Sequence, residues 1–157
     1  YLYQLAIITG ARRGELVALK FSDIDRLANK ITISRAAIKL AGEQAQTKAP
    51  KDYEVRSIAV SPECIKLIEQ LEQEKHFEAV RLGSQWVGDE WLFTQWNGEM
   101  MNPQTPTKQF SKFLSRHGFR HRKFHSLRHT SATLLLYGGV SLKQVQGRLG
   151  HGDIETT

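Results

Sequence analysis

The sequence predicts an α+β fold, a mostly helical domain with a small antiparallel sheet of three strands. Apolar residues recur at helical spacing near both ends of the chain, whereas two short segments, 30–34 and 55–60, alternate at period two. At 157 residues with 40% hydrophobic content, the chain can bury one sizeable core but is too short for two comfortable domains. We therefore expect one domain over residues 1–157.

The first part of the chain should contain two short helices followed by strands. Apolar residues in 2–9 follow helical spacing, and a second helix begins near Glu15, so that two helices flank the segment 10–14. Between the two alternating segments, residues 36–38 and 44–47 have the pattern of a hairpin.

The remaining elements are helices. Ser61 as an N-cap and Pro62 in the first turn predict an amphipathic helix that runs toward Gly83. Punctuating glycines and apolar periodicity then predict three more helices, over 103–117, 126–137 and 141–149. Among their apolar residues, we expect Phe113, Leu134 and Tyr137 to face the core.

Positive charge is concentrated in the last third of the chain. Residues 100–152 contain nine Lys or Arg and five of the six histidines but no Asp or Glu, whereas the preceding residues carry 13 basic and 14 acidic side chains. This asymmetry predicts a polyanionic partner, with a basic solvated flank as the alternative. No apolar stretch is long enough to span a membrane, and the lone Cys64 fits a buried thiol in a reducing, cytoplasmic compartment.

The turn that contains Arg12 and Arg13 is the first candidate site. It is bounded by Gly10 and Gly14 at the start of a helix, where a fixed backbone can project both side chains. Arginine can bind two phosphate oxygens at once and stays charged at any working pH. The turn therefore predicts a phosphate contact, with solvated surface as the alternative.

A second candidate site lies at the start of the 126–137 helix. His125 and Arg128 are three residues apart, so they share a helical face and can address the same anion. Helix capping is the alternative for His125. The four-residue spacing of His117, His121, His125 and His129 invites a metal site, but Gly118 and the helix break before residue 126 argue against it. We expect no metal and no cofactor.

The predicted hairpin carries Lys48, which can swing into a groove and donate a proton; most such lysines are simply solubilising. Lys51 follows in the same segment, ahead of Arg56.

Taken in order, these motifs resemble the catalytic domain of tyrosine recombinases of the phage integrase type, whose fold is the DNA breaking-rejoining type. The resemblance spans residues 9–151. The motifs that carry it are Thr9-Gly10-x-Arg12-x-x-Glu15-Leu16, Thr47-Lys48 before Arg56-x-Ile58, His125-x-Leu127-Arg128-His129 and Leu149-Gly150-His151.

The resemblance implies a role for each candidate. Arg12 and Arg128 would grip the non-bridging oxygens of the scissile DNA phosphate, and His125 and His151 would hydrogen-bond the same group. Lys48, in preference to Lys51, would protonate the departing 5′ oxygen, and Glu15 would orient the Arg12 loop. The remaining expected DNA contacts are Arg13, Lys51, Arg120, Arg122, Lys123 and Lys143.

The resemblance also implies what the whole protein does. It would cut and rejoin double-stranded DNA through a 3′-phosphotyrosyl intermediate, to integrate or excise a mobile element or prophage. It would act as a homo-tetramer on DNA, with a monomer as the expected free state. The family's tyrosine would fall near position 160, so we expect this chain to be a cleavage-inactive catalytic-domain fragment that also lacks the amino-terminal DNA-clamping domain. A type IB topoisomerase uses similar chemistry, but its motif spacings match less well.

A plain DNA reader is the alternative from another class. Residues 139–150 have the pattern of a helix-turn-helix, with the basic last third as its footprint. The function of a plain DNA reader does not require Arg12, Lys48, His125 and Arg128 to lie around one point, whereas that of a recombinase does.

Overall fold

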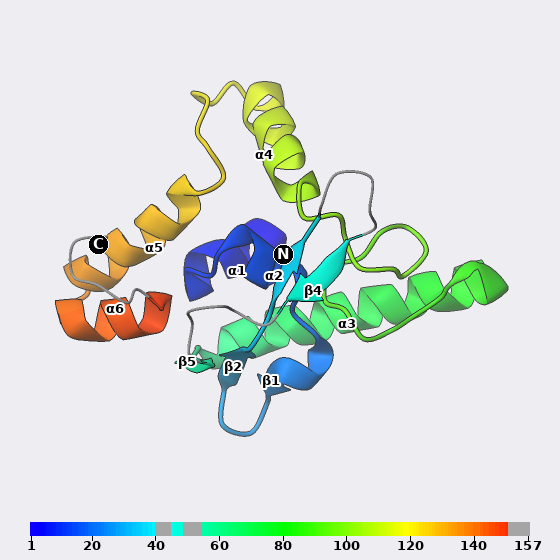
Figure 1. Cartoon of the computed structure of the whole chain (residues 1–157), viewed down its shortest axis with the longest axis horizontal. Coiled ribbons are helices and arrows are strands. Elements are labelled where there is room, and N and C mark those ends of the chain that lie inside the picture. Colours follow the sequence, from blue (N-terminus) through cyan, green and yellow to red (C-terminus); the bar gives the residue numbers. More distant parts are fainter. Residues whose placement is uncertain (40–44, 49–54, 151–157) are drawn as a thin grey trace.

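The computed structural model describes residues 1–39, 45–48 and 55–150 (Figure 1). The helices are α1 (Leu2–Thr9), α2 (Arg13–Val17), α3 (Pro62–Leu82), α4 (Thr105–Arg116), α5 (Ser126–Tyr137) and α6 (Leu142–Leu149). The strands are β1 (Ile24–Asp25), β2 (Lys30–Ile33), β3 (Ala36–Ile38), β4 (Gln46–Lys48) and β5 (Arg56–Ala59), and short 3₁₀ turns cover Phe21–Asp23 and Gly83–Gln85. The predicted α+β class is confirmed.

A three-stranded antiparallel sheet is present, in the order β1-β2-β5. Ile31 of β2 lies opposite Ile24 of β1 and Ile58 of β5, so three buried isoleucines form one row across the inner face. A three-stranded antiparallel sheet was predicted, and its two longer strands are the two predicted alternating segments. The third strand is β1, however, which the sequence did not single out.

The predicted hairpin forms a separate two-stranded sheet, β3-β4, and does not extend the first. The chain leaves β2 through Arg35, whose guanidinium donates to the Asp23 carboxylate at 2.5 Å and to the Ala18 carbonyl at 3.4 Å. These contacts direct the chain toward α2, where buried Ala37 packs against Val17. The predicted turn between β3 and β4 lies outside the described residues.

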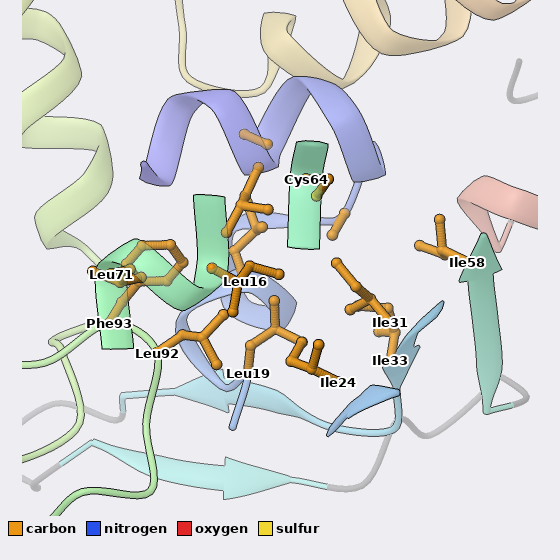
Figure 2. Packing of buried hydrophobic residues seen from close by; sticks show 14 of the residues in the cluster. Leu16, Leu19, Ile24, Ile31, Ile33, Ile58, Cys64, Leu71, Leu92 and Phe93 are labelled. Carbon is orange, nitrogen blue, oxygen red and sulfur yellow. The ribbon is translucent and has the colours of Figure 1, made fainter. Parts of the chain in front are cut away.

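The main core lies between α1, the three-stranded sheet and the first half of α3 (Figure 2). Helix α3 begins as predicted, with the Ser61 hydroxyl accepting from the Cys64 amide and Pro62 at the first position. Cys64 itself is 2% exposed, and burial raises the pKa of its thiol to about 11. It is a buried thiol, as expected.

Three apolar residues expected in the core are exposed instead. Tyr137 is 88% exposed, and Leu134 and Phe113 are also exposed. Helix α5 packs on α1 through the face that carries Arg128 and Ser131. Tyr137 lies nine residues after Arg128, which at 100° per residue places it on the opposite side of the helix. For Leu134 and Tyr137 the prediction was wrong because polar residues, and not the apolar ones, define the buried face of α5, whereas in α4 Phe110 and Leu114 are buried and Phe113 is not.

None of the helices in the described part of the chain is both long and apolar enough to cross a bilayer.

Candidate functional site

The turn between α1 and α2 holds Arg12 in a fixed position. Gly10 ends α1 in the left-handed region, at φ 64°, and a Cβ there would collide with Leu149 of α6. The buried Thr9 hydroxyl donates to the Leu5 carbonyl at 2.6 Å and accepts from the Ala11 amide at 3.2 Å. Helix α2 begins at Arg13 and not after Gly14 as predicted, so Arg12 is its N-cap residue.

Glu15 anchors this turn, as the resemblance implied. Its carboxylate accepts from the Arg12 amide at 2.7 Å and from the Arg12 guanidinium at 3.2 Å, and the side chain is almost fully buried. Burial alone would raise the pKa of Glu15, but hydrogen bonds and charge from Arg56, and then from Arg12, outweigh it and hold the pKa below its usual range. Glu15 is therefore an ionised orienting group.

Arg56 is the member of this site whose role the sequence analysis missed. Its guanidinium donates to both carboxylate oxygens of Glu15, at 3.1 and 2.7 Å. A signal was present: strand alternation places Arg56 on the same inward face as Ile58, and a cation there needs an acid partner.

Three arginines converge on the last turn of α6. Arg56 Nε donates to the Arg148 carbonyl at 2.9 Å, Arg128 Nη2 to the Leu149 carbonyl at 2.7 Å, and Arg12 Nη2 to the Gly150 carbonyl at 3.1 Å. These carbonyls have no partner within the helix and carry the negative end of its dipole, so cations are favoured there. Segments more than a hundred residues apart thus bring Arg12 and Arg128 to one place.

Arg128 is held from two sides. It is 4% exposed, and in addition to Leu149 it donates to the Gly10 carbonyl at 2.7 Å. One planar guanidinium therefore ties the first turn of α5 to the α1–α2 turn and to the end of α6.

His125 lies beside the two arginines, at the N-cap position of α5. Burial lowers the pKa of His125, and the charges of His129, Arg128 and Arg12 lower it further. Its ring contacts that of His129, with centroids 4.9 Å apart. These effects favour the neutral imidazole of His125, the form that can accept a proton.

We expect NMR titration to give His125 a pKa below that of a free imidazole. Replacing His129 with asparagine should raise this pKa because it removes a neighbouring positive charge, whereas Thr133→Ala, one turn further along α5, should not change it. A His125 that titrates at or above the free value would contradict the described electrostatics.

Lys48 ends β4, opposite Ala36 of β3, and is exposed. The hairpin lies next to α2, since a Cβ on Gly14 would be only 2.7 Å from the Ala37 carbonyl oxygen. Two other candidates, Lys51 and His151, lie outside the described residues.

The predicted DNA contacts divide into two groups. Arg13, Arg122 and Lys123 line one cavity of about 480 Å³, which also reaches Arg12 and His125. Arg120 and Lys143 are exposed but do not line it. In the described ranges, no three His, Cys, Asp or Glu side chains are grouped to hold a metal ion.

Comparison with known proteins identifies the class to which this fold and site belong. The phage integrase family model matches residues 1–157, and the chain belongs to this family, that of the tyrosine recombinases and integrases of site-specific recombination. The integrase branch, and not a type IB topoisomerase or a plain DNA reader, is thus supported.

Two curated relatives cover almost the whole chain. A XerC-like tyrosine recombinase of Caldanaerobacter subterraneus is 32% identical over 168 residues, covering 99% of this chain and 43% of the relative. The ICEBs1 integrase of Bacillus subtilis is 25% identical, and the match covers 99% of this chain and 42% of that integrase. The chain therefore spans less than half the length of these relatives.

Solved structures share the fold. The Tn1549 transposon integrase in complex with transposon right end DNA has a TM-score of 0.82 at 23% identity, covering 98% of this chain and 50% of that one. The XerA recombinase has a TM-score of 0.74 at 25% identity, covering 99% and 50%. The predicted recombinase catalytic-domain fold is confirmed.

Proposed function

We propose that the whole protein is a site-specific DNA recombinase that cuts and rejoins double-stranded DNA through a 3′-phosphotyrosyl intermediate, and so integrates or excises a mobile element or prophage. The observation that carries this proposal is the convergence of Arg12 and Arg128 on the end of α6 beside His125, whose lowered pKa favours the neutral imidazole. DNA is named as the bound partner in the related Tn1549 integrase structures, which supports the same partner here.

The two arginines would stabilise the transition state. When an oxygen nucleophile attacks a phosphodiester, negative charge grows on the non-bridging oxygens, and donors already held in place lower the barrier most. Carbonyl contacts fix Arg128, and Glu15 fixes Arg12, so both side chains are preorganised for this role. His151, which follows Gly150 in the sequence, would add a hydrogen bond to the same phosphate.

Cleavage then needs two proton transfers. The hydroxyl of a tyrosine, which the resemblance puts near position 160 of the whole protein, attacks phosphorus as His125 accepts its proton. The bond between phosphorus and the 5′ oxygen breaks, and Lys48 donates a proton to that oxygen. The products are a 3′-phosphotyrosyl ester and a free 5′ hydroxyl; reversal with another 5′ hydroxyl rejoins the strand.

Rejoining strands from two DNA sites requires more than one protomer. We therefore infer a homo-tetramer on DNA and a monomer without it. The cations Arg13, Lys51, Arg120, Arg122, Lys123 and Lys143 would contact phosphates away from the reacting one. Each such contact adds about 0.9 to the slope of log affinity against log salt.

A DNA substrate with sulfur in place of the scissile 5′ oxygen tests the assignment of Lys48. A thiolate is a good leaving group without a proton, so it removes the need for a general acid. In the whole protein, Lys48→Ala should slow cleavage of normal DNA by about 10²–10⁴-fold. It should cleave the sulfur substrate almost as fast as the parent does.

Lys51→Ala is the matched control, and it should cleave both substrates like the parent. If Lys51→Ala instead shows the defect and the rescue, the general acid is Lys51. If sulfur rescues neither variant, a lysine general acid is excluded.

A further inference from the structure

The cavity that contains Arg13 adjoins the Arg12–Arg128 site and extends from it along α2 and α4. Helix α2, helix α4 and the segment 121–125 form its walls; in Figure 1 this segment belongs to the extended connection from α4 to α5. Arg12 and His125 also line it, whereas Arg128 does not. The cavity therefore adjoins the proposed scissile-phosphate site.

The charged side chains that line this cavity are all cationic. Arg13, Arg122 and Lys123 line it together with neutral residues such as Thr107 and Phe124, and no Asp or Glu of the described residues does. The larger cavity of about 820 Å³ beside residues 87–102 is different, because Glu90 and Glu99 line it. An anion is thus favoured in the first cavity and not in the second.

Two contacts fix the walls before any ligand arrives. Arg13 Nη1 donates to the Thr107 hydroxyl at 2.8 Å, which bridges α2 and α4. Phe124 is buried, with its ring centroid 5.8 Å from that of Phe110 and 6.3 Å from that of Tyr3. The buried ring anchors the segment that carries Arg122 and Lys123, so little ordering remains to be done on binding.

We propose that this cavity binds a second backbone phosphate of the DNA, adjacent to the scissile one, through Arg13, Arg122 and Lys123. This inference rests on the proposed recombinase function. The Thr107 hydroxyl, which accepts from Arg13, still has its own O–H to donate, and Ser111 supplies another hydroxyl. Guanidinium forks, ammonium groups and hydroxyls are the groups that commonly contact phosphate oxygens in DNA complexes.

Occupation of this cavity would set the register of the DNA backbone on the enzyme. Arg13 follows Arg12 directly, so a phosphate held by Arg13 determines which phosphate reaches Arg12. Arg13 is thus a positioning residue. Its loss should raise the DNA concentration needed for half-maximal cleavage more than it lowers the rate at saturating DNA.

A scan with neutral methylphosphonates tests the proposal in the whole protein. Each phosphate near the cleavage site is replaced in turn, and affinity is measured for the parent, for Arg13→Ala and for Thr107→Val. In the parent, we expect affinity losses at the scissile phosphate and at one neighbour. In both variants, methylphosphonate at the neighbouring phosphate should cost less affinity than in the parent, whereas the loss at the scissile phosphate should remain. Arg13→Ala should also lower the slope of log affinity against log salt by about 0.9.

Arg81→Ala is the control, because Arg81 is an exposed arginine near the end of α3 that pairs with Glu78. It should give the parent's pattern at every phosphate. If Arg13→Ala also keeps the parent's pattern, the second phosphate site is excluded and the recombinase proposal is unaffected. If the whole protein forms no covalent complex with unmodified duplex DNA, the proposed function itself fails.

Discussion

Replacing Arg128 with lysine is expected to lower the rate of DNA strand cleavage by the whole protein about 10²–10³-fold, the effect of losing one preorganised donor to a developing oxyanion. Lysine keeps the positive charge but cannot hold two acceptors in one plane, as Arg128 holds the Gly10 and Leu149 carbonyls. DNA affinity should change little because many phosphate contacts share it. The measurement is covalent-complex formation on a suicide DNA substrate, together with a binding assay.

The control variant Arg148→Lys distinguishes the loss of a phosphate contact from looser packing of α6. Arg148 also joins α6 to the rest of the molecule, donating to the Ala59 carbonyl at 2.7 Å and to the Ile8 carbonyl at 2.8 Å, but it is not one of the proposed phosphate ligands. We expect this variant to lose stability and still cleave DNA while folded. Equal loss of cleavage in both variants would assign the Arg128 effect to the docking of α6.

Replacing Glu15 with glutamine should produce the largest loss of stability, about 3–5 kcal/mol in the free energy of unfolding. The Glu15 side chain is only 3% exposed and that of Arg56 only 9%, so removing the carboxylate leaves a buried guanidinium without its counter-charge. Urea denaturation measures the effect. Glu72→Gln is the control: its exposed pair with Arg26 should contribute only about 0–1 kcal/mol.

A double-mutant cycle identifies the cause of this loss. Glu15→Gln combined with Arg56→Gln should be less destabilised than the two single losses predict, because neither charge is then left alone. Simple additivity would contradict the described pair.

The free energy of unfolding of the parent should also fall at acid pH because Glu15 becomes protonated. The pKa of Glu15 is lowered in the folded state, so as pH falls the unfolded chain takes up this proton first. The stabilisation is therefore complete above the ordinary carboxyl pKa and is lost as pH falls through the lowered value. Glu15→Gln should lack this part of the pH dependence.

The sequence predicted most of the helices and strands because their local signals were strong. Ser61 and Pro62 marked the start of α3, and Gly10 marked the end of α1. The exposure of Tyr137 was not predictable in the same way. The apolar residues 134–137 are consecutive and therefore point to all sides of α5, so periodicity did not single out the face that packs on α1, and that face is defined by Arg128 and Ser131.

The candidate site was predictable as a set of residues but not as a geometry. The order of motifs singled out Arg12, His125 and Arg128, but nothing local indicated that the last carbonyls of α6 would receive the arginines. Contacts between residues more than a hundred positions apart depend on how helices pack. The cavity walls from α4, with Thr107 and Ser111, belonged to no motif and became visible only in three dimensions.

The anchoring of α6 by three arginines also fixes a point of departure for the rest of the polypeptide. A trans-peptide chain spans at most about 3.3–3.6 Å per residue. If the proposed tyrosine lies some ten residues after Gly150, its Cα therefore stays within roughly 35 Å of that glycine, whichever path the chain takes. A connection this short raises the effective concentration of the tyrosine hydroxyl around nearby phosphates and restricts which DNA strand it can reach.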